Sequence, residues 1–201
     1  MAFESITIPT AVASLAAAAL AVLVAYLRGR TKKARNAIID LETAFREFIR
    51  EELDLVGVSP AQAELSRAEL ESALTSALDG YHPTEDSPVD VRVWDGRHFA
   101  PAPEALDSLA TIGRVLETMP YRPARFDCEN FAGFYWSFAP LIFGVNTVAL
   151  VNDTSAGHAY NLIVDAEGGI HVYEPQDAVF LELGETYNDV TYSLAHGEVT
   201  F

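Results

Sequence analysis

Apolar residues recur at intervals of three and four positions in several stretches of the chain, which is the spacing of one face of a helix. Residues 36–53 combine such a stripe with acidic residues and are predicted to form an amphipathic helix. A second helix is predicted from Ser59, which is followed by proline, to Gly80. The two helices are expected to form a hairpin over residues 36–80, and a third helix is predicted over residues 104–119.

In the carboxyl-terminal part of the chain, apolar residues come in shorter runs that are separated by turns. A helix is predicted from Cys128 to about residue 139, followed by a strand over residues 147–151. Two further strands are predicted, one beginning near His158 and one ending near Gln176. A helix packed on a small antiparallel sheet belongs to the α+β class, which is the fold class that we predict.

The chain is therefore expected to have three regions. Residues 1–35 are predicted to form an apolar helix with a basic flank, residues 36–80 the helical hairpin, and residues 81–201 the α+β domain. In the first region, residues 5–27 form a run of 23 uncharged residues, and a helix needs about 20 to cross a bilayer. Five cations follow within residues 28–35, which predicts a single-pass membrane protein with its carboxyl-terminal domain in the cytoplasm.

The alternative for residues 5–27 is a helix buried in a protein assembly such as a virion. Eight of the 23 residues in this run are alanines, whose hydrophobicity is marginal for a membrane span. The sequence therefore leaves two partners open for this segment, a membrane or a protein assembly.

The charge of the chain is strongly acidic, with 29 Asp and Glu against 13 Lys and Arg and a net charge of −16. Such a chain is not expected to bind nucleic acid, because neutralising phosphates requires clustered cations. The composition suits a halophilic interior, although an acidic chain from a genome of high GC content has the same balance. The single cysteine excludes an internal disulfide, and the oligomeric state stays open.

The position of that cysteine suggests chemistry. Cys128 stands at the predicted start of a helix, where free N–H groups and the helix dipole stabilise a thiolate. His158 and Glu174 follow on neighbouring predicted strands, so that a nucleophile, a base and a residue that orients the base occur in order. The alternative is a buried, unreactive cysteine between Phe126 and Phe131.

The register of the two strands decides whether these side chains can meet. If the loop between the strands is residues 165–169, Val164 lies opposite Ile170 and His158 is a diagonal neighbour of Glu174 on the same face. A loop that is one residue shorter turns His158 to the other face. The predicted site therefore requires the first register or a bulge.

Three short motifs resemble a known family. Residues 127–132 (DCENFA), 157–161 (GHAYN) and 172–176 (VYEPQ) look like the papain-like and transglutaminase-like cysteine peptidase superfamily. The resemblance is narrowest to the peptidase domain at the carboxyl end of a mushroom agglutinin and to related phage and archaeal-virus proteins. It covers about residues 121–176, little more than a quarter of the chain.

The resemblance implies a papain-like core, in which Cys128 is the nucleophile, His158 the general base and Glu174 the orienting acid, with Gln176 beside them. Its substrate would be a peptide or another amide or ester. One departure is that residues 117–127 contain neither Gln nor Asn to donate to an oxyanion. The oxyanion would then rely on the backbone N–H of Cys128 and on a second donor that the sequence does not identify, with Arg122 and Arg125 as candidates.

The resemblance also implies a metal site, because acidic residues beside the cysteine bind a divalent cation in the agglutinin. Asp127, Glu129 and Asn130 offer the oxygen ligands that calcium prefers. No other cofactor is expected.

Two functions follow from the sequence. In the first, the chain is a thiol-dependent hydrolase or acyl transferase tethered by its amino-terminal helix. In the second, it is a catalytically inactive structural or binding module, such as a component of a virion tail or a membrane-inserting component.

Overall fold

A computed structural model describes residues 32–52, 61–78, 89–117 and 119–201 of the chain. The chain divides into two compact units, residues 1–56 and residues 57–201. In the first unit, helix α2 (Lys32–Glu52) confirms the amphipathic helix predicted over residues 36–53, and its Ile39 and Phe48 side chains are exposed.

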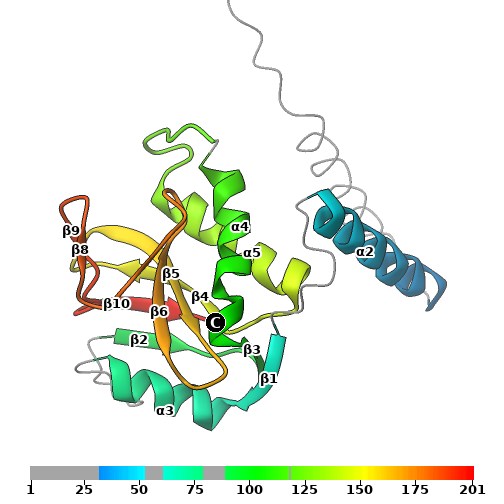
Figure 1. The fold of residues 1–201 in the computed structure, drawn as a ribbon, viewed down its shortest axis with the longest axis horizontal. Coiled ribbons are helices and arrows are strands. Elements are labelled where there is room, and N and C mark those ends of the chain that lie inside the picture. The colour runs from blue at the N-terminus through cyan, green and yellow to red at the C-terminus, as the bar shows by residue number, and fades with distance from the viewer. Residues whose placement is uncertain (1–31, 53–60, 79–88, 118) are drawn as a thin grey trace, which may run out of the picture. The chain divides into compact units, whose positions relative to one another are not determined.

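The second unit is built on a six-stranded sheet (Figure 1). Its strands lie in the order β2-β10-β4-β5-β6-β7, and all neighbours are antiparallel except β10 and β2, which are parallel. The strands are β2 (Val89–Arg92), β4 (Val148–Asp153), β5 (His158–Val164), β6 (Ile170–Glu174), β7 (Val179–Leu181) and β10 (Gly197–Thr200). Two short strand pairs accompany the sheet, β1 (Ala61–Ser66) with β3 (Arg97–Pro101) and β8 (Thr186–Tyr187) with β9 (Val190–Thr191).

Helix α3 (Arg67–Ala77) corrects the second predicted helix. Residues 61–66 form strand β1 instead of the first turns of a helix, because they pair with β3. The helix begins after Ser66, whose side chain accepts the backbone N–H of Glu69 while the Glu69 carboxylate accepts the Ser66 N–H. This reciprocal cap specifies a start seven residues later than Ser59, which lies outside the described residues.

Two further helices confirm the predicted ones. A single 3₁₀ turn, η1 (Pro103–Ala105), leads into α4 (Leu106–Leu116), and α5 (Cys128–Phe143) begins at the predicted cysteine. Helix α5 runs four residues beyond residue 139 and ends at Gly144, whose φ of 70° is the left-handed conformation that ends many helices. Since α5 packs on β4 and β5 of the sheet, the predicted α+β class is confirmed.

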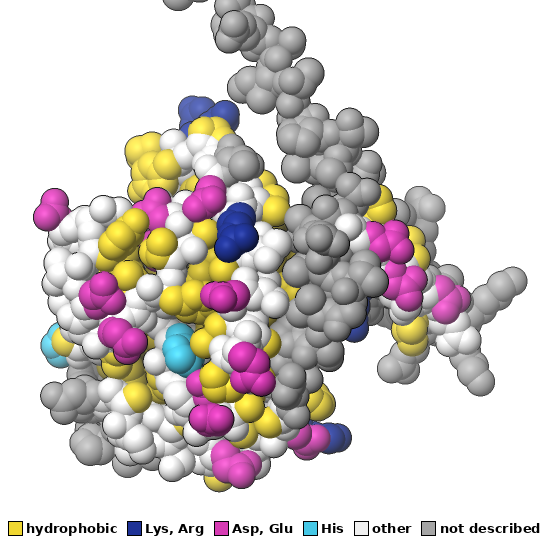
Figure 2. Space-filling model, in the orientation of Figure 1, with side chains coloured by type: hydrophobic (Ala, Val, Ile, Leu, Met, Phe, Trp, Pro, Cys, Tyr) yellow, Lys and Arg dark blue, Asp and Glu magenta, His cyan; other side chains and the backbone are white. Residues whose placement is uncertain are grey.

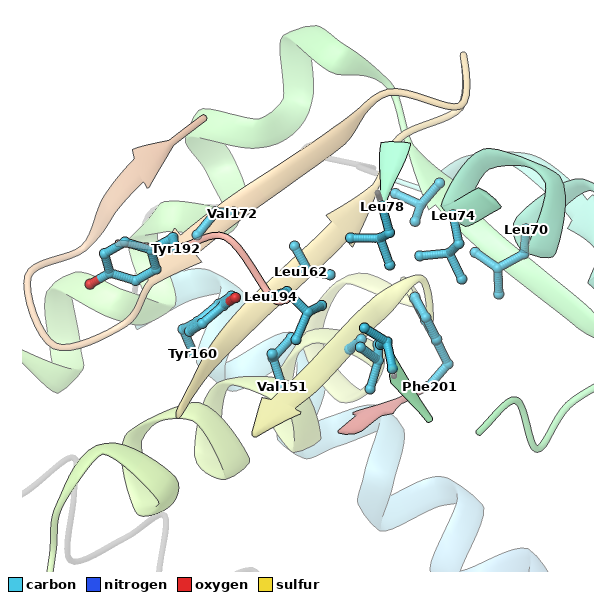
Figure 3. Close-up of a cluster of buried hydrophobic side chains, with 14 of the residues drawn as sticks. Leu70, Leu74, Leu78, Val151, Tyr160, Leu162, Val172, Tyr192, Leu194 and Phe201 are labelled. Carbon is cyan, nitrogen blue, oxygen red and sulfur yellow. The ribbon is translucent and has the colours of Figure 1, made fainter. Parts of the chain in front are cut away.

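The two faces of the sheet pack against different layers. On one face, alternate strand residues such as Tyr160, Leu162 and Val172 join Leu70 and other leucines of α3 in a buried hydrophobic cluster (Figure 3). On the other face, the buried Asn161 donates from Nδ2 to the carbonyl oxygen of Ala132 in α5, at 3.0 Å. The sheet is thus covered on both faces. This agrees with the strand sequences, because strands with few polar residues need both faces buried.

The surface of the second unit is acidic. On the face that Figure 2 shows, carboxylate side chains are spread widely and basic side chains are confined to a few places. Two of the few arginines form exposed ion pairs with acidic residues, Arg97 with Glu64 and Arg92 with Asp90.

The predictions for the amino-terminal region have a different outcome. The apolar run of residues 5–27 lies outside the described residues, and no helix within the described ranges is long and apolar enough to cross a membrane. The prediction of a single-pass membrane protein is therefore corrected: it relied on the length of this run, and none of the described helices supports a membrane span. The predicted domain boundaries at 35/36 and 80/81 stay predictions, although the division at 56/57 falls within the predicted hairpin.

Candidate functional site

The loop before α5 fixes the position of Cys128. Arg122 and Phe126 exchange two backbone hydrogen bonds of 2.7 and 2.8 Å, which close a tight loop. Within it, Ala124 has a φ of 57°, and its N–H donates to Oδ2 of Asp127 at 2.9 Å. Asp127 is the residue before the helix, so Cys128 is the first residue of α5, as the sequence predicted.

Strands β5 and β6 have the first of the two registers that the sequence left open. Val164 pairs with Ile170, so the connecting turn is residues 165–169. His158 Nε2 lies 2.6 Å from Oε2 of Glu174, and the two side chains are 15% and 3% exposed. The predicted contact between His158 and Glu174 is therefore present in the structure.

Glu174 is a buried carboxylate with three neighbouring donors. Its Oε2 accepts from His158 Nε2 and from the Tyr192 hydroxyl at 2.9 Å, and its Oε1 accepts from the Gln176 backbone N–H at 2.9 Å. Gln176 thus contacts Glu174 through its backbone. A buried carboxylate requires such donors, because removal from water without them is costly. Burial raises the pKa of Tyr192, and the negative charge of Glu174 raises it further.

A second buried carboxylate shapes the turn that leads into His158. Asp153 accepts backbone N–H groups of Ser155 and Ala156 at 3.0 Å each through Oδ1, together with the Ser155 hydroxyl. Its Oδ2 accepts the Tyr160 hydroxyl and the Leu194 N–H, both at 3.0 Å. These five bonds hold the turn between β4 and β5 and so set where β5 begins.

Cys128 and His158 line one open pocket of about 330 Å³, between the start of α5 and the start of β5. The remaining lining residues are Glu129, Asn152, Asp153, Thr154, Gly157 and Ala159. Among the described residues, neither Nδ1 of His158 nor the Cys128 backbone N–H has a hydrogen-bond partner. The structure therefore brings Cys128 and His158 to the lining of one pocket, while the Nε2 atom of His158 contacts Glu174.

The electrostatics of the pocket rim are acidic. Partial desolvation raises the pKa of the exposed Tyr121, and the negative charges of Asp127 and Glu129 raise it further. The lining contains carboxylates and no Lys or Arg.

The three predicted calcium ligands are adjacent in the chain, but the side chains of two of them already accept backbone N–H groups. Asp127 Oδ2 accepts the Ala124 N–H, and Asn130 Oδ1 accepts the Asp127 N–H at 3.2 Å. Glu129 is exposed, and in the described part of the chain no three His, Cys, Asp or Glu side chains are grouped so that they could hold a metal ion. A cation would compete with the bonds that begin α5, and calcium binding here stays a prediction.

Sequence reasoning missed two residues of the site, Asp153 and Tyr192. The segment from Asp153 to Gly157 (DTSAG) has the composition of a turn held by an aspartate side chain, and this signal could have identified Asp153. Tyr192 has no comparable signal, because its contact with Glu174 depends on how the β8–β9 pair folds against β6.

The comparisons with known proteins find similarity to solved structures, two of which are described here. No family model and no curated protein matches the chain. The chain is similar to the Polyporus squamosus lectin PSL1a in complex with E64, with a TM-score of 0.50 and 18% identity, over 70% of this chain and 52% of that one. A structure of Polyporus squamosus lectin bound to Neu5Acα2-6Galβ1-4GlcNAc is also similar, with a TM-score of 0.45 and 18% identity, over 70% and 50%. The chain spans about half the length of these proteins, and the likeness to PSL1a shows the fold alone.

These findings correct the family assignment. No peptidase family matches the chain, and the fold is shared with a lectin, so the resemblance to the papain-like and transglutaminase-like cysteine peptidase superfamily was wrong. The three motifs are segments of five or six residues, which is too short to specify a family. The description of the chain as a cysteine peptidase is wrong for the same reason. The catalytic roles of four residues stay predictions: those of Cys128, His158, Glu174 and Gln176.

Proposed function

We propose that residues 57–201 act as a binding module whose ligand occupies the pocket between the starts of α5 and β5. The observation that carries this proposal is the open pocket of about 330 Å³ that Cys128 and His158 line together. The fold shared with PSL1a is consistent with a binding role, and that protein is known in complex with E64. E64 is therefore the first ligand to test.

The chemistry of the pocket favours a ligand with a carbonyl or carboxylate oxygen. The backbone N–H groups at the start of α5 can donate to such an oxygen, because the first turn of a helix leaves its donors without intrahelical partners. Glu129 at the rim favours a ligand that also carries a positive charge, since the lining contains no cation to oppose it.

Isothermal titration calorimetry of the full chain with E64 tests this proposal. We expect binding by the wild type, and binding weakened at least tenfold by His158→Gln, which removes the imidazole but keeps an N–H donor for Glu174. Ser72→Ala is the matched control, because Ser72 lines a separate hollow with residues of α3 and of the 165–169 turn. No heat of binding in the wild type, or equal weakening by Ser72→Ala, would contradict the proposal.

A second candidate function, thiol-dependent hydrolase or acyl transferase, is favoured by the 2.6 Å contact between His158 and Glu174. In this reaction the Cys128 thiolate attacks an amide or ester carbonyl, and the thiol proton passes through His158 to the leaving group. Water or an amine then releases the acyl group from the thioester, which restores the thiol. Glu174 keeps the imidazole oriented and stabilises its protonated form.

Alkylation of Cys128 by iodoacetamide separates the two candidates. A hydrolase or transferase requires alkylation at neutral pH that is faster than that of free cysteine and that His158→Gln slows. A binding module without thiol chemistry requires reversible E64 binding, no mass increase on Cys128, and alkylation no faster than that of free cysteine.

A further inference from the structure

The strongest inference concerns the buried residue behind the pocket. We propose that Tyr192 is a positioning residue, which holds the Glu174 carboxylate and thereby fixes the orientation of His158. The inference rests on the proposed function, because His158 lines the proposed ligand site.

Tyr192 contacts both members of the pair. Its hydroxyl donates to Oε2 of Glu174 at 2.9 Å, and the same oxygen lies 2.6 Å from Nε2 of His158. Its ring also meets the His158 ring edge to face, with centroids 5.8 Å apart and planes at 84°. Since Tyr192 is 2% exposed, water does not compete for its hydroxyl.

Backbone hydrogen bonds and ring packing hold Tyr192 in place. The β8–β9 pair turns at Asn188 and Asp189, which both have a positive φ, and Tyr192 follows β9 directly. Its backbone N–H donates to Glu185 at 2.9 Å, and its carbonyl accepts from Gly184 at 2.8 Å. The ring packs edge to face on Tyr160, with centroids 5.0 Å apart, and Figure 3 shows the two rings side by side at one end of the cluster.

These contacts determine the orientation of the His158 imidazole. The Gln176 N–H holds Oε1 of Glu174 and the Tyr192 hydroxyl holds Oε2, so the carboxylate has one orientation. The Nε2 atom of His158 can then bond to Glu174 in one orientation of the ring. If the imidazole turned about its side-chain axis, this hydrogen bond would break. The opposite nitrogen, Nδ1, is thereby directed away from Glu174.

The test is ¹⁵N nuclear magnetic resonance of the full chain, with the Nε2–H signal of His158 assigned by its loss in His158→Gln. Tyr192→Phe keeps the ring and removes the hydroxyl. We expect this variant to shift the Nε2–H signal and to speed exchange of that proton with water about tenfold, as the loss of one hydrogen bond to a charged group predicts. Tyr173→Phe is the matched control, because its buried hydroxyl donates to the Ala110 carbonyl of α4 and not to Glu174, and it should leave both properties unchanged.

A folded Tyr192→Phe chain with the wild-type Nε2–H signal and exchange rate would overturn the inference. If this variant does not fold, the inference is tested on the wild type. We expect a cross-peak between the Tyr192 hydroxyl proton and the His158 Nε2 proton, and its absence would overturn the inference. Failure of the proposed function is distinguishable, because an absence of E64 binding or of thiol reactivity leaves these two measurements on His158 unaffected.

Discussion

Substitution of Gly113 by alanine should destabilise the second unit, because the helix α4 approaches a buried tyrosine at this glycine. A Cβ atom on Gly113 would lie 1.7 Å from the hydroxyl oxygen and 2.8 Å from Cζ of Tyr173, and 3.2 Å from the Cβ of Ala178. Ordinary contacts are at least 3.4 Å, so the tyrosine hydroxyl would have to move by about 1.7 Å. The ring is not free to move, since it packs against Tyr135 and Phe180 with centroids 4.4 and 4.8 Å away.

The magnitude follows from three effects. Overpacking a buried site costs about 1–3 kcal/mol. Displacement of the Tyr173 hydroxyl also breaks its 3.2 Å bond to the Ala110 carbonyl and leaves a buried polar group unpaired, which costs about 1–3 kcal/mol. The higher helix propensity of alanine offsets about 1 kcal/mol. We expect Gly113→Ala to lower the free energy of unfolding by about 3 kcal/mol.

Equilibrium unfolding in urea, followed by circular dichroism, measures this effect. Gly133→Ala is the matched control: Gly133 lies within α5, and a Cβ there meets no atom within 4 Å. We expect this control to raise the free energy of unfolding by about 0.5–1 kcal/mol. The reasoning is refuted if Gly113→Ala unfolds at the wild-type midpoint or above it.

Three further predictions concern single side chains. Ser66→Ala should lower the free energy of unfolding by about 1 kcal/mol in urea, because it removes the cap of α3 that Ser66 shares with Glu69; wild-type stability would contradict this role. The hydrogen bond from Arg97 lowers the pKa of Glu64 below its ordinary value of 4.5, so this stabilisation is present above that pH and is lost as the pH falls through the pKa of the folded state. The difference in melting temperature between wild type and Glu64→Gln should therefore shrink below about pH 4.5, and a difference that grows there would refute the assignment. Asp153→Asn should cost about 3 kcal/mol in urea unfolding, because an amide group would face donors where a buried carboxylate now accepts five bonds; a loss below about 1 kcal/mol would count against that role.

The sequence was most informative where local signals set the structure. The helix start at Cys128 was predicted, whereas the sequence left two registers of β5 with β6 open; the one with a turn over residues 165–169, which the structure has, allows the contact between His158 and Glu174. A second local signal was overlooked at Ser66, where serine is followed three residues later by glutamate, a pattern typical of a helix start. Ser59 fits the same pattern with Gln62, so the pairing of residues 61–66 with β3 decides between the two starts.

Contacts between distant segments were beyond prediction from one chain. Strand β10 lies between β2 and β4 and runs parallel to β2, and no local pattern indicates such an order. The Tyr192 hydroxyl reaches Glu174 across 18 residues and depends on the β8–β9 turn. Three short motifs matched the order of a thiol site, yet order alone did not identify a family.

The most direct test of the proposed binding site is a map of amide chemical shifts in the full ¹⁵N-labelled chain as E64 is added. The proposal predicts that the shifts concentrate at residues 128–129, 152–154 and 157–159, which line the pocket, and that residues 65–76 and 166–168 around the second hollow stay unchanged. An absence of shifts up to millimolar E64, or shifts confined to the second hollow, would contradict it.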